Sequence, residues 1–77
     1  MMEELIRLIA TKIVDNPEMV QVSEIRGEHT NVIELKVAED DIGKIIGKKG
    51  NTISAIRTIL NNAGMKQNKR YILEILE

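Results

Sequence analysis

The chain has 77 residues, with 11 Lys and Arg against 12 Asp and Glu, one His, one Tyr, and no Cys, Trp or Phe. A chain of this length buries only about 60% of its unfolded surface, so one small two-layer domain with an aliphatic core is expected. The lack of Cys and the single His exclude disulfides, thiolate chemistry and Cys-based zinc sites, so the chain lacks the usual groups of most enzymes. We expect no catalytic residue, no cofactor and no metal.

The first expected element is a helix over residues 2–15. Its apolar residues repeat at helical spacing, and Asn16-Pro17 ends it because the residue before a proline avoids helical backbone angles. The acidic start of the chain, together with Arg7 and Lys12 inside this stretch, argues against a signal peptide or a membrane span. The expected location is therefore the cytoplasm.

Two strands are expected next. Residues 19–26 are rich in β-branched side chains, with Val20 and Val22 on one face. Residues 27–30 have turn composition, and residues 31–37 alternate cleanly between apolar and charged side chains. This pattern predicts an antiparallel hairpin.

A short helix is expected after the acidic segment 39–41. Ile42, Ile45 and Ile46 follow at helical spacing, and acids directly before a helix are typical capping and dipole partners. The alternative is that Glu39, Asp40 and Asp41 repel phosphate and mark the edge of a binding groove.

A further helix and a strand complete the chain. Asn51 and Thr52 offer N-capping oxygens for a helix that ends at Gly64 in the C′ position, and residues 71–76 form the last strand. The order α-β-β-α-α-β predicts an α+β fold with a three-stranded mixed sheet and all three helices packed on one face. The helical crossover allows strand 71–76 to lie parallel to strand 31–37.

Charge is distributed unevenly along these elements. Residues 1–41 carry four basic and ten acidic side chains, whereas residues 42–73 carry seven basic side chains and no acid. The net charge of −1 therefore hides a long basic segment, which is typical of a protein with a polyanionic partner. The shortage of aromatic residues argues against modules that stack bases, such as the RRM and the OB and cold-shock barrels.

The stretch 43–50, Gly-Lys-Ile-Ile-Gly-Lys-Lys-Gly, was compared with the known phosphate-binding loops. It fails as a Walker A loop because only three residues separate Gly43 from Gly47 and Lys49 stands where a hydroxyl is required. It also lacks the second glycine of a dinucleotide fingerprint. Both nucleotide-binding interpretations fail on spacing.

The same stretch suits the backbone of another chain. Glycines at both ends of the turn 47–50 allow close approach, and the amides at the start of the following helix attract phosphate. Lys48 and Lys49 lie at the expected tip, with Lys44 and Arg57 on the flanking helices. The alternative is an ordinary helix-to-helix turn with surface lysines.

Ile-Ile-Gly-Lys-Lys-Gly at 45–50, with Ile53 downstream, resembles the GXXG signature of the KH domain, and the element order resembles its type II form. Together with the segment Ala-Ile-Arg-Thr-Ile at 55–59 and the length, it is similar to the small bacterial KH family KhpA or YlqC. The resemblance implies one KH domain over residues 1–77 that holds about four unpaired nucleotides, with phosphates on the loop and bases on an aliphatic floor.

The implied function is non-enzymatic binding of single-stranded RNA with low sequence specificity, in a regulatory or RNA-chaperone role. The residues expected to contact RNA are Lys44, Ile46, Gly47, Lys48, Lys49, Gly50, Asn51, Thr52 and Arg57. For Lys66, Lys69 and Arg70, a solvated helix face and an RNA contact are equally plausible.

The alternative function is protein assembly, with RNA contact secondary. The resemblance implies self-association as a homodimer and pairing with a larger KH-containing protein, KhpB or Jag, and a lone KH unit gains avidity by pairing. Ile59, Ala63 and Met65 are candidates for such a surface, or else belong to the core.

Overall fold

The computed structural model describes residues 2–77 of the chain. The helices and strands are α1 (Met2–Ile13), β1 (Gln21–Arg26), β2 (Thr30–Lys36), α2 (Ile42–Ile46), α3 (Asn51–Lys66) and β3 (Arg70–Leu76). Short 3-10 turns, η1 (Pro17–Met19), η2 (Glu39–Asp41) and η3 (Lys48–Gly50), precede β1, α2 and α3. The predicted order α-β-β-α-α-β is confirmed.

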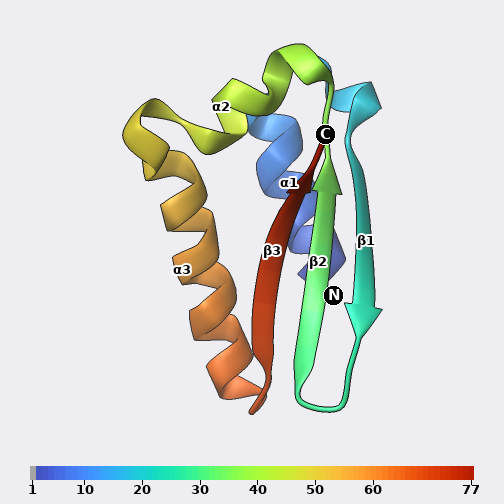
Figure 1. Ribbon diagram of the computed structural model, residues 1–77, viewed down its shortest axis with the longest axis vertical. Helices are drawn as coiled ribbons and strands as arrows, with labels where there is room; N and C mark the ends of the chain where they lie inside the picture. Colours follow the sequence, from blue (N-terminus) through green and yellow to red (C-terminus); the bar gives the residue numbers. More distant parts are fainter. Residues whose placement is uncertain (1) are drawn as a thin grey trace.

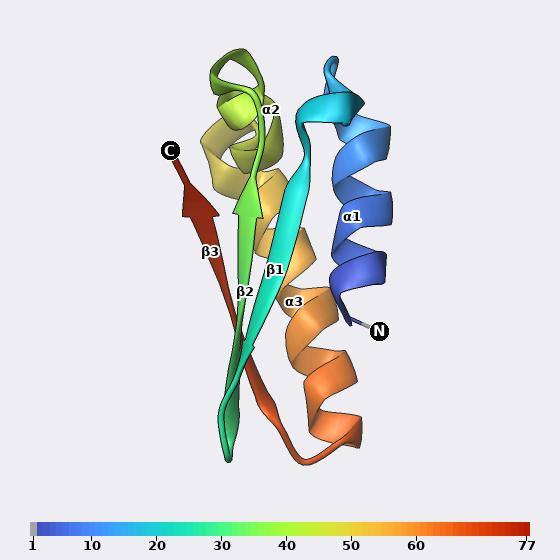
Figure 2. The same cartoon turned by 90° about the vertical axis from the view of Figure 1, so that its right-hand side faces the viewer.

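The sheet has the strand order β1-β2-β3, with β2 in the centre. β1 pairs antiparallel with β2, and β3 pairs parallel with β2, as the hairpin and the helical crossover require. All three helices lie on one side of the sheet and leave its other face open (Figure 1, Figure 2). The predicted fold class, an α+β type II KH-like arrangement with a mixed three-stranded sheet, is therefore correct.

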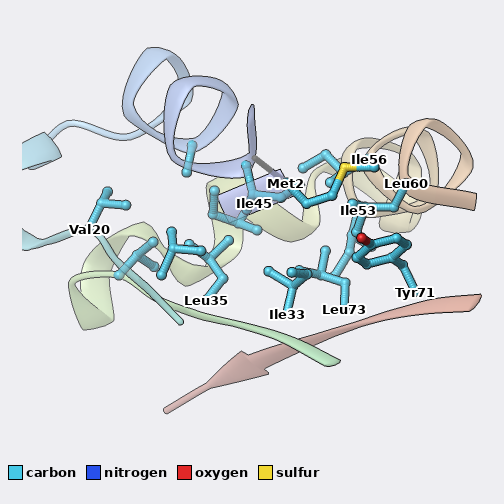
Figure 3. Packing of buried hydrophobic residues seen from close by; sticks show 14 of the residues in the cluster. Met2, Val20, Ile33, Leu35, Ile45, Ile53, Ile56, Leu60, Tyr71 and Leu73 are labelled. Carbon is cyan, nitrogen blue, oxygen red and sulfur yellow. The ribbon is translucent and has the colours of Figure 1, made fainter. Parts of the chain in front are cut away.

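Apolar side chains from both layers meet in one core. Ile33 and Leu35 alternate inward along β2 and are fully buried, and Ile6 and Leu60 face them from α1 and α3. Figure 3 shows side chains from the sheet pointing toward those of the helices. The buried members of this cluster are Met2, Ile6, Ala10, Val14, Val20, Val22, Ile33, Leu35, Val37, Ile45, Ile53, Ile56, Leu60, Tyr71 and Leu73.

Helix α3 runs two residues past Gly64, so the prediction that Gly64 ends the helix is wrong. Gly64 is buried inside α3, where a Cβ would lie 2.5 Å from the carbonyl oxygen of Lys69 and 2.8 Å from Cδ2 of Tyr71. The residue with left-handed backbone angles is Asn68, with φ 56°. Glycine at 64 therefore serves the close approach of β3 to α3 rather than the helix end.

The predicted N-caps of α3 also differ from the structure. Gly50 occupies the N-cap position and no side chain caps the helix, while Asn51 and Thr52 lie within its first turn. The other element bounds differ from the prediction by one or two residues. The first strand begins later than predicted because η1 takes up residues 17–19.

Asp41 was expected to be a capping or dipole partner at the start of a helix, and it is only 1% exposed. Its carboxylate accepts hydrogen bonds from the amides of Asp15 (3.1 Å) and Asn16 (3.0 Å) and from the Asn16 side chain (3.0 Å). Burial alone would raise the pKa of Asp41, but these hydrogen bonds and the charge of Lys44 together lower it. Asp41 occupies the N-cap position of α2, but its side chain makes no capping hydrogen bond there and instead ties the end of α1 to the start of α2. The phosphate-repelling alternative stays a prediction.

Candidate nucleic-acid interface

The loop between α2 and α3 has a backbone that only glycine adopts easily at its two ends. Gly47 has φ 77° and ψ 173°, and Gly50 has φ 75° and ψ 13°. A Cβ on Gly47 would clash with the Thr52 hydroxyl and lie 2.8 Å from the Thr52 backbone nitrogen, whereas a Cβ on Gly50 would meet open space. Gly47 is thus required for both conformation and space, and Gly50 for conformation alone.

Lys48 and Lys49 form the tip of this loop and are exposed. Within residues 2–77, neither ammonium group has an ion pair or a hydrogen bond. The loop leads directly into the 16-residue helix α3, whose positive end and first backbone amides lie beside these two cations. Exposed cations beside the amides at a helix N-terminus are the chemistry that favours phosphate groups.

Lys44, unlike the two loop lysines, has an acidic partner. Its ammonium lies 3.1 Å from the Asp15 carboxylate at the end of α1. The hydrogen bond and charge of Asp15, with smaller contributions from the charges of Asp41 and Asp40, raise the pKa of Lys44. A phosphate would therefore have to compete with Asp15 for this side chain.

Arg57 links α3 to β3. It extends from α3 to β3, where one guanidinium nitrogen donates a hydrogen bond to the carbonyl oxygen of Leu73 at 3.4 Å. β3 is an edge strand of the sheet. Arg57 thus places a cation between α3 and the edge of the sheet.

Ile46 supplies apolar surface next to the loop. It is the last residue of α2 and is 39% exposed, whereas its neighbour Ile45 is fully buried. The predicted aliphatic floor therefore has one exposed member directly before Gly47. The remaining predicted contacts, Asn51 and Thr52, lie in the first turn of α3.

Sequence reasoning missed a groove between α3 and β3. One hollow, of about 320 Å³, is lined by Arg57, Asn61, Arg70, Tyr71, Ile72 and Leu73. A second, of about 630 Å³, is lined by Asn61, Met65, Asn68, Lys69, Arg70 and Tyr71. The four-residue spacing of Arg57, Asn61 and Met65, which places them along one stripe of α3, was the available signal in the sequence.

The structure shows the surroundings of the residues for which the sequence left two interpretations open. Lys69 is held by a hydrogen bond from its ammonium to the carbonyl oxygen of Gly27 at 3.3 Å, whereas Arg70 is exposed at the groove. Ile59 and Met65 are 45% and 73% exposed, so they do not belong to the core, and Ala63 is half-buried.

Neither metal binding nor membrane insertion finds support among the described residues. Across residues 2–77, no group of three or more His, Asp and Glu side chains is placed to hold a metal ion. His29 is exposed in the turn between β1 and β2. Within the same residues, no helix has the length and apolar character needed to cross a membrane.

Comparisons with known proteins agree with this geometry. A family model described as "KhpA/KhpB, KH domain" matches residues 3–75. The chain is 49% identical over 75 residues to the RNA-binding protein KhpA of Clostridium acetobutylicum, and 51% identical over 75 residues to that of Caldanaerobacter subterraneus subsp. tengcongensis, covering 97% of this chain and 100% of each relative.

A third relative shows the same degree of similarity. The chain is 49% identical over 76 residues to the RNA-binding protein KhpA of Aquifex aeolicus, which covers 99% of this chain and 96% of the relative. No solved structure matches the chain at a significant level. From the family model and from relatives that match along nearly their whole length, this chain belongs to the KhpA/KhpB family of KH domains.

Proposed function

We propose that this protein binds single-stranded RNA without catalysing a reaction. The observation that carries the proposal is the loop 47–50, where two unpaired ammonium groups stand at the positive end of α3 inside a segment that has no acid from residue 42 to 73. The relatives reported above bear the name RNA-binding protein KhpA. The proposed location is the cytoplasm.

The proposed mechanism separates phosphate contacts from base contacts. Lys48, Lys49 and the first amides of α3 hold the sugar-phosphate backbone of about four nucleotides, while bases rest on aliphatic surface that includes Ile46. Arg57 borders the same groove from α3. Phosphate contacts carry no sequence information, so the proposed specificity is low and suits a regulatory or RNA-chaperone role.

A double substitution of the loop lysines tests this function. Lys48→Asp with Lys49→Asp is expected to abolish binding of a single-stranded oligoribonucleotide measured by fluorescence anisotropy. The wild-type log K is expected to fall with log salt at a slope of roughly −2 to −3, as for three or four neutralised phosphates on a single strand. Circular dichroism and the melting temperature are expected to stay near wild type, because both side chains are exposed.

The matched control is Lys12→Asp with Lys36→Asp, which makes the same charge change on α1 and on β2, away from the loop. This control is expected to keep most of the RNA affinity. Equal losses in the two variants would show that only net charge matters, and undiminished binding by the loop variant would refute the loop as the phosphate site.

A second candidate function is assembly with another KH protein. Ile59 and Met65 expose apolar surface along α3, and the matching family includes both KhpA and KhpB. We infer that this surface serves a homodimer or a complex with a KhpB/Jag-type partner. Light scattering at several concentrations tests the homodimer: a mass that rises with concentration in the wild type and not in Ile59→Glu supports it, and a constant monomer mass contradicts it.

A further inference from the structure

An acidic side chain just beyond the end of α1 contacts α2, the helix that leads into the loop 47–50. The Asp15 carboxylate lies 3.1 Å from the ammonium of Lys44, which stands three residues before Gly47. Figure 1 and Figure 2 show the end of α1 and the whole of α2 at the same end of the molecule. An anion of the protein itself therefore occupies a lysine close to the candidate phosphate site.

The backbone at Asp15 is fixed, so its carboxylate is held beside Lys44. The amides of Asp15 and Asn16 donate hydrogen bonds of 3.1 Å and 3.0 Å to the carboxylate of Asp41, which is 1% exposed. Asp41 is the last residue of η2 and directly precedes α2. These bonds tie the residue that carries the anion to the helix that carries Lys44, which preorganises the ion pair.

The ion pair is nevertheless exposed enough to open. The side chains of Lys44 and Asp15 are 45% and 73% exposed. Ion pairs on such a surface are weak, because water competes for both charges. The flexible stem of a lysine also allows its ammonium to turn toward another anion. Lys44 can therefore exchange the carboxylate for a phosphate, but it loses one ion pair for the one that it gains.

We propose that Asp15 is a competing anion that limits the RNA affinity of this site, because it holds Lys44 until a phosphate displaces it. This proposal rests on the proposed function. In the wild type, the exchange of one anion for another adds little to the affinity or to its salt dependence. The released Asp15 carboxylate also repels the bound strand. Lys48 and Lys49 have no ion pair within residues 2–77, so their contacts with phosphate carry no such cost.

Asp15→Asn tests the competition by fluorescence anisotropy with an eight-nucleotide oligouridylate. The amide keeps the shape of the side chain and leaves the backbone hydrogen bond to Asp41 in place, but it removes the charge. The variant is expected to bind about fivefold more tightly, the effect of one contact between unit charges at about 4 Å in water. Its salt slope is expected to become steeper by about 0.7, because one further phosphate is neutralised.

A double-mutant cycle with Lys44→Gln shows whether the two side chains act through each other. In the Asp15→Asn protein, Lys44→Gln is expected to cancel the gain in affinity. In the wild type it is expected to cost less, because Asp15 already neutralises Lys44 there. The measurements are made at about 0.15 M salt, where charges that are not in contact are largely screened. Equal effects of Lys44→Gln in the two proteins would overturn the proposal, as would unchanged affinity in Asp15→Asn.

The matched control is Glu18→Gln, which removes one negative charge three positions beyond Asp15. Glu18 is exposed in η1 and has no ion pair among residues 2–77. The control is expected to bind RNA like the wild type. A gain equal to that of Asp15→Asn would show that only net charge matters and would overturn the role of Asp15 alone. Failure of the wild type to bind the RNA would overturn the proposed function as well.

Discussion

Alanine at Gly47 tests whether the loop is held in the conformation described above. The backbone angles of Gly47, φ 77° and ψ 173°, lie in a region that other residues almost never adopt, and a Cβ there would lie 2.8 Å from the Thr52 nitrogen. Such strain costs about 2 to 3 kcal/mol. Because each kcal/mol shifts the melting temperature of a domain this size by about 4–8 °C, Gly47→Ala is expected to lower it by roughly 10–20 °C.

Two other glycines serve as graded controls. Gly50→Ala strains the backbone without a clash, at φ 75° with open space around the Cβ, and is expected to cost about 1 to 2 kcal/mol. Gly43 lies in α2 with nothing within 4 Å of its Cβ, so Gly43→Ala is expected to stabilise the protein by about 0.5 to 1 kcal/mol. Melting followed by circular dichroism gives the order, and a Gly47→Ala variant as stable as Gly43→Ala would refute this account of the loop.

Three further predictions concern residues that stabilise the fold. Gly64→Ala is expected to destabilise the protein by about 1 to 3 kcal/mol in chemical unfolding, because the Cβ would lie 2.5 Å from the Lys69 carbonyl oxygen; a neutral effect would contradict the close packing of α3 on β3. Leu60→Ala removes a side chain that is 1% exposed and is expected to cost about 2 to 5 kcal/mol, measured in the same way. Asp41→Asn is expected to lower the melting temperature at neutral pH, because an amide cannot accept all the hydrogen bonds that Asp15 and Asn16 donate. Since the pKa of Asp41 lies below its ordinary value of 3.8, the difference from the wild type is expected to fade as the pH falls through this lowered pKa. A difference in melting temperature that does not depend on pH would contradict this account.

Local periodicity was sufficient to predict the layers of the fold. The alternation along residues 31–37 placed Ile33 and Leu35 inward, and both are fully buried. Ile56 and Leu60 likewise lie at helical spacing, and both are buried in α3. These patterns are properties of single elements, so they can be read without knowing what the elements pack against.

Contacts between distant segments were not predictable from the same patterns. Asp41 accepts hydrogen bonds from Asn16, 25 residues earlier, and in the sequence it looks like any acid before a helix. Gly64 was predicted to end the helix, but glycine is required there because the chain leading into β3 packs too close to leave room for a Cβ. In both cases tertiary packing decides the role of the residue, and the local pattern does not show that packing.

Part of the candidate site was predictable from the sequence and part of it was not. The glycine spacing and the two lysines of the loop 47–50 were visible in the sequence because they are contiguous. The groove between α3 and β3 was not, because its lining comes from two elements, such as Asn61 on α3 and Arg70 on β3. The ion pair between Lys44 and Asp15 was not predictable either, because the two residues lie far apart in the sequence.

The most direct test of the central claim is a titration of the isotopically labelled protein with a four-nucleotide single-stranded RNA, followed by amide chemical shifts. The account predicts that the largest shifts fall on residues 47–53, at the loop and the start of α3, while Ser23 and Lys36 on the open face of the sheet stay unchanged. Shifts centred on the open face of the sheet, with the loop amides unmoved, would contradict it.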